Sequence, residues 1–240
     1  MLVSQKCYQN VLGMILIASL ASSFVLVQPG YSTIITSNNG SNTSNSNNLD
    51  ISKEVFVVDY ANIRIQKFDT DGKFIAKWGS KGSGDGEFRH PHGIAIDSSG
   101  SVYVTDMTNL NIQKFTSDGK FIKKWGSKGD AKGQLNSPAG IDVDSSGNLY
   151  VADDGNSRIQ KFTNNGDFVT MWGSKGSKNG QLDRPHDIDI DSSGNNDVYV
   201  AEQGNFQIQK FTSDGKFITK WGTEGSDDNQ FQDPHSVAVY

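Results

Sequence analysis

Short apolar runs alternate with polar, glycine-rich stretches along most of the chain, and the alternation repeats. An apolar run closed by an acidic residue occurs at residues 55–59, 102–106, 149–153 and 198–202. The runs are rich in β-branched and aromatic residues, and Gly, Asn, Asp and Ser separate them, which is typical of short strands. Beyond residue 50 the apolar positions show no helical period. The pattern therefore predicts an all-β fold.

The repeat is marked most clearly by tryptophan. Trp78, Trp125, Trp172 and Trp221 are spaced by 47, 47 and 49 residues, and the segment Ile-Gln-Lys-Phe precedes each of them unchanged. Four strands in a unit of about 40–50 residues are typical of a propeller blade. Repeats starting near residues 55, 102, 149 and 198 therefore predict a β-propeller of four four-stranded blades, with the repeated Trp and Phe side chains between the blades.

The phase of the repeat leads to an expectation about ring closure. The first unit begins at its second strand, near Val55, and residues 234–240 form a lone first strand. We expect this C-terminal strand to pair with residues 55–59 and so to close the first blade and the ring. The alternative is an incomplete arc, either a truncated product or part of a larger ring that a second chain completes as an oligomer.

The repeated residues resemble the NHL repeat. The motif Asp-x-x-Asn-x-Arg-Ile-Gln-Lys-Phe at residues 59–68 is followed by Gly-x-Phe, Trp-Gly, Pro-x-Gly-Ile-Ala and Asp-x-x-Gly, and the resemblance covers residues 55–240. It implies a β-propeller but little about activity, because folds host many functions. Some NHL propellers bind RNA, but a net charge of −5 disfavours nucleic acid as a partner here. Others belong to tripartite-motif ubiquitin ligases, and a chain with one cysteine has no RING-like set of ligands.

The first fifty residues differ from the repeats. Residues 11–27 carry no charge and follow Lys6. The length of this run is at the short limit for a membrane span, and it suits the core of a signal peptide. We expect residues 1–32 to be a cleaved signal peptide or a hydrophobic helix that anchors the protein in a membrane. Residues 33–54 are expected to form a disordered, Asn/Ser-rich tether. This organisation predicts an extracytoplasmic protein, secreted or held at the cell surface.

Three histidines form the sharpest candidate site. His92, His186 and His235 each follow a proline at the same repeat position, whereas the remaining copy has Ala139. Equivalent positions on innermost strands should form a ring about the propeller axis. Three histidines with a vacant fourth place resemble a metal site that has an open coordination position. The alternative is that these side chains only form hydrogen bonds at the channel mouth.

This site also resembles that of the peptidyl-hydroxyglycine amidating lyases, propellers that hold zinc through histidines in Pro-His motifs. The resemblance makes Arg64 and Arg158 candidate catalytic residues, because their segment aligns with one rich in functional residues. Two features depart from that family. Those lyases have six blades and structural disulfides, and Asn111 and Gln207 replace arginine in two copies here.

We expect structural roles at turns for two sets of acidic residues. Those that close the apolar runs should bond to nearby backbone N–H groups at turns; they are Asp59, Asp106, Asp153 and Glu202. The residues that precede Ser-Ser-Gly are also expected to form turns, with calcium at the channel mouth as an alternative; they are Asp97, Asp144 and Asp191.

The sequence favours an interaction module over an enzyme, because no convincing catalytic set stands out. Loops on one face of a rigid scaffold would bind a protein or a glycan. The alternative is a metal-dependent lyase or hydrolase that uses the three histidines, with zinc or calcium as the candidate ion. Membrane association would run through residues 11–27 if the leader is not cleaved.

Overall fold

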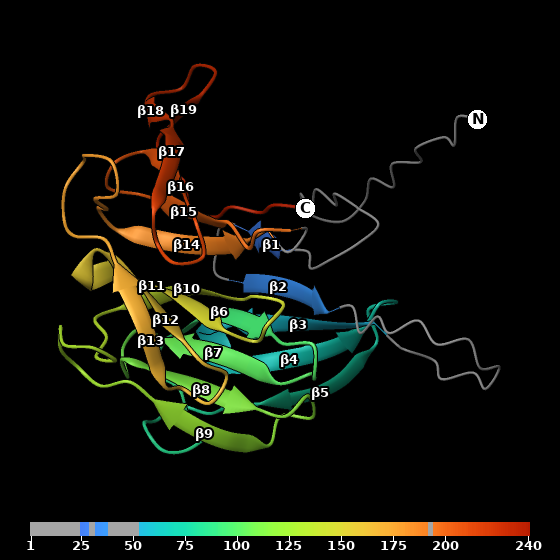
Figure 1. The fold of residues 1–240 in the computed structure, drawn as a ribbon. Helices are drawn as coiled ribbons and strands as arrows, with labels where there is room; N and C mark the ends of the chain where they lie inside the picture. The colour runs from blue at the N-terminus through green and yellow to red at the C-terminus, as the bar shows by residue number, and fades with distance from the viewer. Residues whose placement is uncertain (1–24, 29–31, 38–52, 192–193) are drawn as a thin grey trace, which may run out of the picture.

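The computed structural model describes residues 25–28, 32–37, 53–191 and 194–240, and these residues form a propeller-like arrangement of antiparallel sheets (Figure 1). We call the sheets blades 1 to 4. Blade 1 consists of β1 (Val25–Gln28), β2 (Ser32–Ser37), β3 (Glu54–Asp59), β4 (Arg64–Asp69) and β5 (Phe74–Trp78). Blade 2 consists of β6 (Pro91–Ile96), β7 (Val102–Asp106), β8 (Asn111–Phe115) and β9 (Phe121–Trp125).

The two remaining blades repeat the same order of strands. Blade 3 consists of β10 (Pro138–Val143), β11 (Leu149–Asp153), β12 (Arg158–Phe162) and β13 (Phe168–Trp172). Blade 4 consists of β14 (Pro185–Ile190), β15 (Val198–Glu202), β16 (Gln207–Phe211) and β17 (Phe217–Trp221). A small parallel pair, β18 (Thr223–Glu224) and β19 (Gln230–Phe231), follows, and short 3₁₀ helices lie at η1 (Tyr60–Asn62) and η2 (Asp154–Asn156). The expected all-β class is confirmed, and blades 2 to 4 are four-stranded as expected, whereas blade 1 has five strands.

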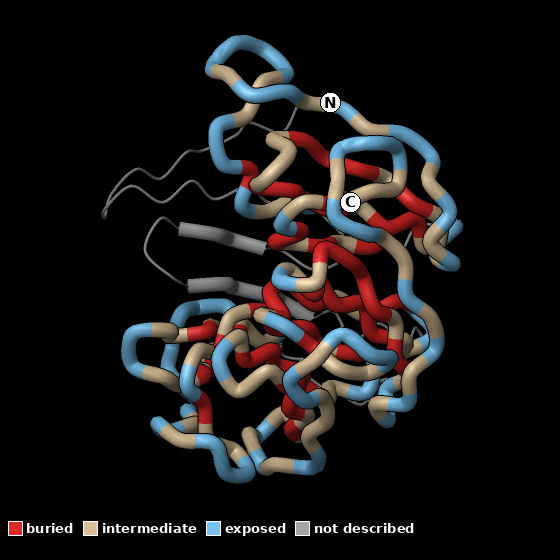
Figure 2. The backbone as a smooth tube through the Cα atoms, turned by 90° about the vertical axis from the view of Figure 1, so that its left-hand side faces the viewer, coloured by how far each residue is buried: buried red, intermediate tan, exposed pale blue. Residues whose placement is uncertain are grey.

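The apolar core lies between successive blades. Phe56 and Ile65 of blade 1 pack against Val104 and Phe115 of blade 2, and all four side chains are at most 1% exposed. Trp78 joins them, with its ring centroid 6.1 Å from that of Phe56 and 6.0 Å from that of Phe115. Equivalent clusters join blades 2 and 3 and blades 3 and 4. Figure 2 shows this buried backbone in red, inside the exposed loops.

The expected closure of blade 1 by the C-terminal strand is wrong. The strand beside β3 is β2, with Ile34 paired with Val57 and Thr36 paired with Val55. Because β2 occupies the hydrogen-bonding edge of β3, residues 234–240 take another place.

The C-terminal segment, residues 234–240, runs along β14. Val237 N–H donates to Asp187 Oδ2 over 3.2 Å, and Val239 N–H donates to Asp189 Oδ2 over 2.5 Å. Two carboxylates of blade 4 therefore hold this segment at the innermost position that follows β14.

The N-terminal expectations fall mostly outside the described residues. Ser32–Ser37, inside and next to the segment expected to be a tether, forms β2, and residues 25–27 of the apolar segment belong to β1. Within the described ranges, no helix has the length and apolar character needed to span a membrane.

Candidate functional site

The three candidate histidines lie at the start of innermost strands. His92 follows Pro91 in β6, His186 follows Pro185 in β14, and His235 follows Pro234 in the C-terminal segment. In both strands the register with the neighbouring strand shifts directly after the proline. Such irregularities turn a side chain away from the regular alternation of a strand. The repeat therefore delivers each imidazole to the same end of its blade.

The structure brings these three imidazoles together. One ligand atom from each of His92, His186 and His235 lies within 4.8 Å of the others. The ring centroids are 4.0 Å apart for His186 and His235, and 4.7 Å apart for His92 and His186. Ring nitrogens around a tetrahedral zinc ion are ~3.3 Å apart, given Zn–N bonds of ~2.0–2.1 Å. Small side-chain rotations would therefore bring the three nitrogens to one ion.

Ala139 explains how two of the rings come so close. It occupies the equivalent position in β10, the strand between β6 and β14 in the order of blades, and it is fully buried. Its backbone carbonyl accepts a hydrogen bond from Thr105 Oγ1 over 2.6 Å. A methyl group here supplies no ligand and leaves room for His92 and His186 to meet across it.

The protonation state of the site suits metal binding. Burial and the neighbouring imidazoles lower the pKa of His92 to about 3, and burial together with His235 lowers the pKa of His186 to about 4. His186 Nδ1 lies 3.2 Å from the backbone carbonyl oxygen of His235. A proton on Nδ1 would be donated to this carbonyl, and Nε2 would then be the ligand atom. Metal-binding histidines usually make such a hydrogen bond with the ring nitrogen that does not bind the metal.

Two further aromatic residues adjoin the three histidines. The ring of His90 is 6.0 Å from that of His92, and the ring of Tyr60 is 4.4 Å from that of His90. Burial lowers the pKa of His90. Sequence reasoning did not single out this pair. The available signal was a histidine at a position that holds serine, arginine or aspartate in the other repeats.

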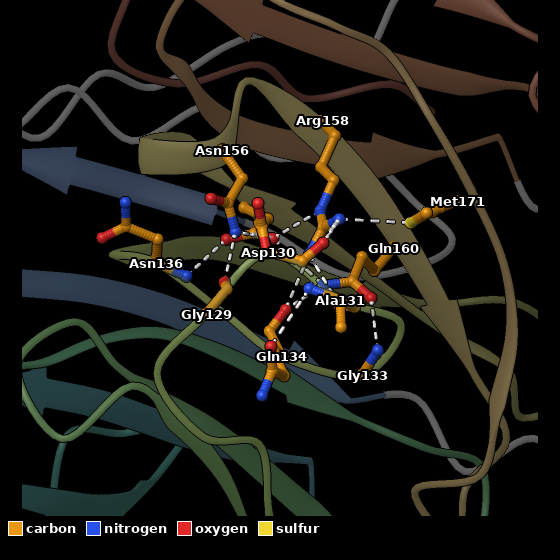
Figure 3. Close-up of polar contacts among 11 residues, drawn as sticks. Gly129, Asp130, Ala131, Gly133, Gln134, Asn136, Asn156, Arg158, Gln160 and Met171 are labelled. Carbon is orange, nitrogen blue, oxygen red and sulfur yellow. Dashed lines mark hydrogen bonds and ion pairs between the residues drawn. The ribbon is translucent and has the colours of Figure 1, made fainter.

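Arg158, a candidate catalytic residue, is engaged in a structural network (Figure 3). Its guanidinium is buried and forms an ion pair with Asp153 at 2.8 Å. The other N–H groups donate to Met171 Sδ and to three backbone carbonyls of the preceding loop, those of Asp130, Ala131 and Gln134. All five donors are thus used to hold the loop between blades 2 and 3.

Arg64, the second candidate, makes a simpler contact. Its Nε donates to Asp59 Oδ2 over 2.7 Å, and its side chain is 29% exposed. In blade 4 the same position is Gln207, whose Nε2 donates to Glu202 Oε1 over 2.8 Å. In blade 3, Pro138 of the innermost strand pairs with Asp153, and Asp153 pairs with Arg158. The arginine position therefore lies two strands outward from the innermost strand, and the two backbones are roughly 10 Å apart there.

The acidic residues that close the second strands take the structural role expected of them. Asp106 accepts hydrogen bonds from the backbone N–H groups of Arg89, Thr108 and Asn109. Asp97 likewise accepts from Ser99 and Ser101 within its own turn. These carboxylates order the turns and the loops between blades.

A third set of acidic residues, which sequence reasoning missed, lies on the innermost strands. Asp142 Oδ2 accepts from Ile190 N–H over 2.8 Å, and Asp187 and Asp189 bond the C-terminal segment in the same way. Burial raises the pKa of Asp187 to about 7 and that of Asp189 to about 6. The signal in the sequence was aspartate at alternate positions of an otherwise apolar run.

Comparison with known proteins agrees with the propeller-type fold. Residues 39–124 match a family described as a 6-bladed beta-propeller, and residues 135–162 match the NHL repeat. No curated protein matches the chain. The chain therefore contains an NHL repeat at residues 135–162 and has a propeller-type fold.

Solved structures share this fold at low sequence identity. Virginiamycin B lyase from Staphylococcus aureus has a TM-score of 0.54 and 19% identity, over 83% of this chain and 69% of that one. Hydrazine synthase from Kuenenia stuttgartiensis has a TM-score of 0.52 and 14% identity, over 70% of this chain. A protein of unknown function from Bacteroides caccae has a TM-score of 0.51 and 14% identity, over 70% of this chain. The chain spans only 45% of the hydrazine synthase chain and 56% of the Bacteroides chain, and these likenesses concern the fold alone.

Proposed function

We propose that this chain is a propeller-type module that binds one transition-metal ion through His92, His186 and His235. The observation that carries the proposal is the convergence of three imidazoles, contributed by three separate repeats, to within 4.8 Å. Imidazole nitrogens suit zinc and other transition metals, whereas calcium prefers oxygen ligands. The ligand set therefore favours zinc over calcium.

The residues around the ion would prepare it for a ligand. Three protein ligands leave one coordination position open, and zinc in such a site acts as a Lewis acid. The His235 carbonyl would fix the tautomer of His186, and Tyr60 and His90 would line one side of the site. This arrangement is compatible with a metal-dependent lyase or hydrolase, for which the resemblance to the amidating lyases is the second support.

A second candidate function is the binding of a protein or a glycan without chemistry. The loops between blades, such as residues 79–90 and 126–137, lead directly into the prolines that precede the innermost strands. They therefore lie at the same end of the blades as the histidines, and this end offers one composite surface. A location outside the cytoplasm stays a prediction from residues 1–32.

Zinc uptake by the untagged full chain tests the metal proposal. We expect one zinc ion per chain, with a large loss of affinity when His92, His186 or His235 is replaced by alanine. His90→Ala is the matched control, because His90 adjoins the site but is not one of the three ligands. A metal-free wild-type chain, or equal affinity in the ligand variants and the control, would leave only the interaction module.

A further inference from the structure

The three junctions between successive blades share one apolar contact. The indole of each blade lies on a glycine in the turn between the third and fourth strands of the next blade. A Cβ atom at Gly119 would lie 2.5 Å from the ring of Trp78, and one at Gly215 would lie 2.4 Å from the ring of Trp172. Only glycine allows the indole to come this close.

The matching partners at the two ends of the array are not joined in this way. A Cβ atom at Gly72, the equivalent glycine of blade 1, would meet no other described residue within 4 Å. Trp221, the equivalent tryptophan of blade 4, is 36% exposed. One indole and one glycine turn of the same design therefore remain available.

A lysine contact repeats in the same manner. At each junction a third-strand lysine donates to a backbone carbonyl of the next blade, and the distances are 3.0 Å for Lys67 to Ser117 and 3.1 Å for Lys114 to Asn164. Lys210 of blade 4 instead pairs with Asp197 of its own blade at 2.7 Å. The acceptor equivalent to Ser117 is the carbonyl of Thr70 in blade 1.

The loops between blades give a third repeated contact. Gln113 Nε2 donates to the Glu87 carbonyl over 2.7 Å. The equivalent glutamine of blade 3, Gln160, donates in the same way to the Gln134 carbonyl in the loop that leads into blade 3. In blade 1 the glutamine is Gln66, which donates to Asp59 within its blade. The loop at residues 222–233 already has the shape of the others, because Gly225 N–H donates to Phe231 O over 3.1 Å.

The apolar face of blade 1 is also less buried than its equivalents. Phe74 is 49% exposed, and Phe68 and Val57 are only partly buried. The residues equivalent to Phe68 and Val57 in blade 2 are Phe115 and Val104, both 0% exposed. Burying this apolar area against a partner of matching shape would stabilise the complex.

We propose that blade 4 of one copy docks head-to-tail on blade 1 of a second copy. The junction would repeat the three internal ones, with Trp221 on Gly72, Lys210 donating to the Thr70 carbonyl and Gln66 donating to the Gln230 carbonyl. Within the described ranges of one copy, no hydrogen bond joins residues 222–240 to β3, β4 or β5. A second copy supplies the surface that each end matches.

The junction requires one exchange of strands. In the internal junctions, the loop leads into the innermost strand of the blade on which it docks. Residues 234–240 would therefore pair with β3 of the second copy in place of its β2, while Asp187 and Asp189 still hold them beside β14. Two such junctions would join two copies head-to-tail, with each copy contributing its blade 1 to one junction and its blade 4 to the other.

The mass of the full chain in solution, measured by light scattering over a range of concentrations, tests this proposal. We expect a dimer, and we expect Trp221→Ala to raise the dissociation constant by about 30-fold or more, as for a central tryptophan in an interface. Ile218→Ala is the matched control, because Ile218 is on the same strand and 43% exposed, as its equivalents are in every blade. A wild-type monomer up to the solubility limit, or a dimer unaffected by Trp221→Ala, overturns the proposal.

A mixing experiment tests the head-to-tail arrangement directly. Trp221→Ala damages one end and Phe68→Ser the other, so each variant alone should be mostly monomeric. Mixed in equal amounts, they should form a dimer through the one intact junction, provided that both variants retain a cooperative melt. Absence of dimer in the mixture of folded variants would exclude a head-to-tail contact.

Discussion

The two arginines at the same repeat position should behave very differently when replaced by alanine. Arg158 is 7% exposed and donates to a buried carboxylate, three carbonyls and a sulfur atom. Arg64 is 29% exposed in its side chain and bonds only Asp59 among the described residues. The pair therefore provides its own control.

The expected cost follows from what each substitution leaves behind. Removing one partner of a buried ion pair destabilises a protein by about 3–5 kcal/mol. Asp153 would keep hydrogen bonds from Asn136, Asn156 and Gln160, so the lower end of that range, ~3 kcal/mol, is expected for Arg158→Ala. Exposed ion pairs contribute about 0–1 kcal/mol, which is the expectation for Arg64→Ala.

Urea unfolding of the full chain measures both free energies. Arg158→Gln should recover part of the loss, because Gln207 fills this position beside Glu202 in blade 4. Zinc affinity should be unchanged in all three variants, since neither arginine is a metal ligand. Equal destabilisation by Arg64→Ala and Arg158→Ala would refute the reasoning, and so would a loss of zinc affinity without a loss of stability in Arg158→Ala.

Three other substitutions test the packing and the buried charges. Trp125→Ala should destabilise the protein by ~3–5 kcal/mol in thermal or urea unfolding, whereas Ile122→Ala, 47% exposed on the same strand, should stay within ~0.5 kcal/mol. Gly166→Ala should cost ~1–3 kcal/mol more than Gly147→Ala, because the two glycines share φ values of +82° and +83° but only the first would place a Cβ 2.6 Å from an indole; similar losses would contradict this. Burial and the carboxylate of Asp189 raise the pKa of Asp142, so stability should fall as pH rises from the unfolded pKa to the folded one. Asp142→Asn should therefore be more stable than the wild type at about pH 7.5 and similar to it at about pH 4, and an unchanged pH profile of unfolding would contradict that.

The repeat explains why much of this architecture could be predicted. Strand positions follow from local alternation, and the convergence of His92, His186 and His235 follows from equivalent positions in repeated units. Chemistry that depends on one repeat position is therefore visible in the sequence. The same reasoning correctly assigned the turn carboxylates, such as Asp106, to backbone N–H groups.

The ends of the array could not be predicted, because they depend on pairing between distant segments. The run Ser-Thr-Ile-Ile-Thr-Ser at residues 32–37 lies outside the period and beside an Asn/Ser-rich stretch, so its pairing with β3 had no periodic signal. The hydrogen bonds that Asp187 and Asp189 accept from residues 237–239 likewise join positions 50 residues apart in the sequence. The hydrogen-bond partners of Arg158 could not be predicted for a similar reason, since they lie on a loop whose path the sequence does not reveal.

The most direct test of the three-histidine centre is X-ray absorption at the zinc edge on the zinc-loaded, untagged full chain. Three imidazole nitrogens are expected at ~2.0–2.1 Å, with one oxygen ligand such as water in the remaining position. A shell made only of oxygen ligands, or a spectrum unchanged when His92, His186 and His235 are all replaced by alanine, would contradict this expectation.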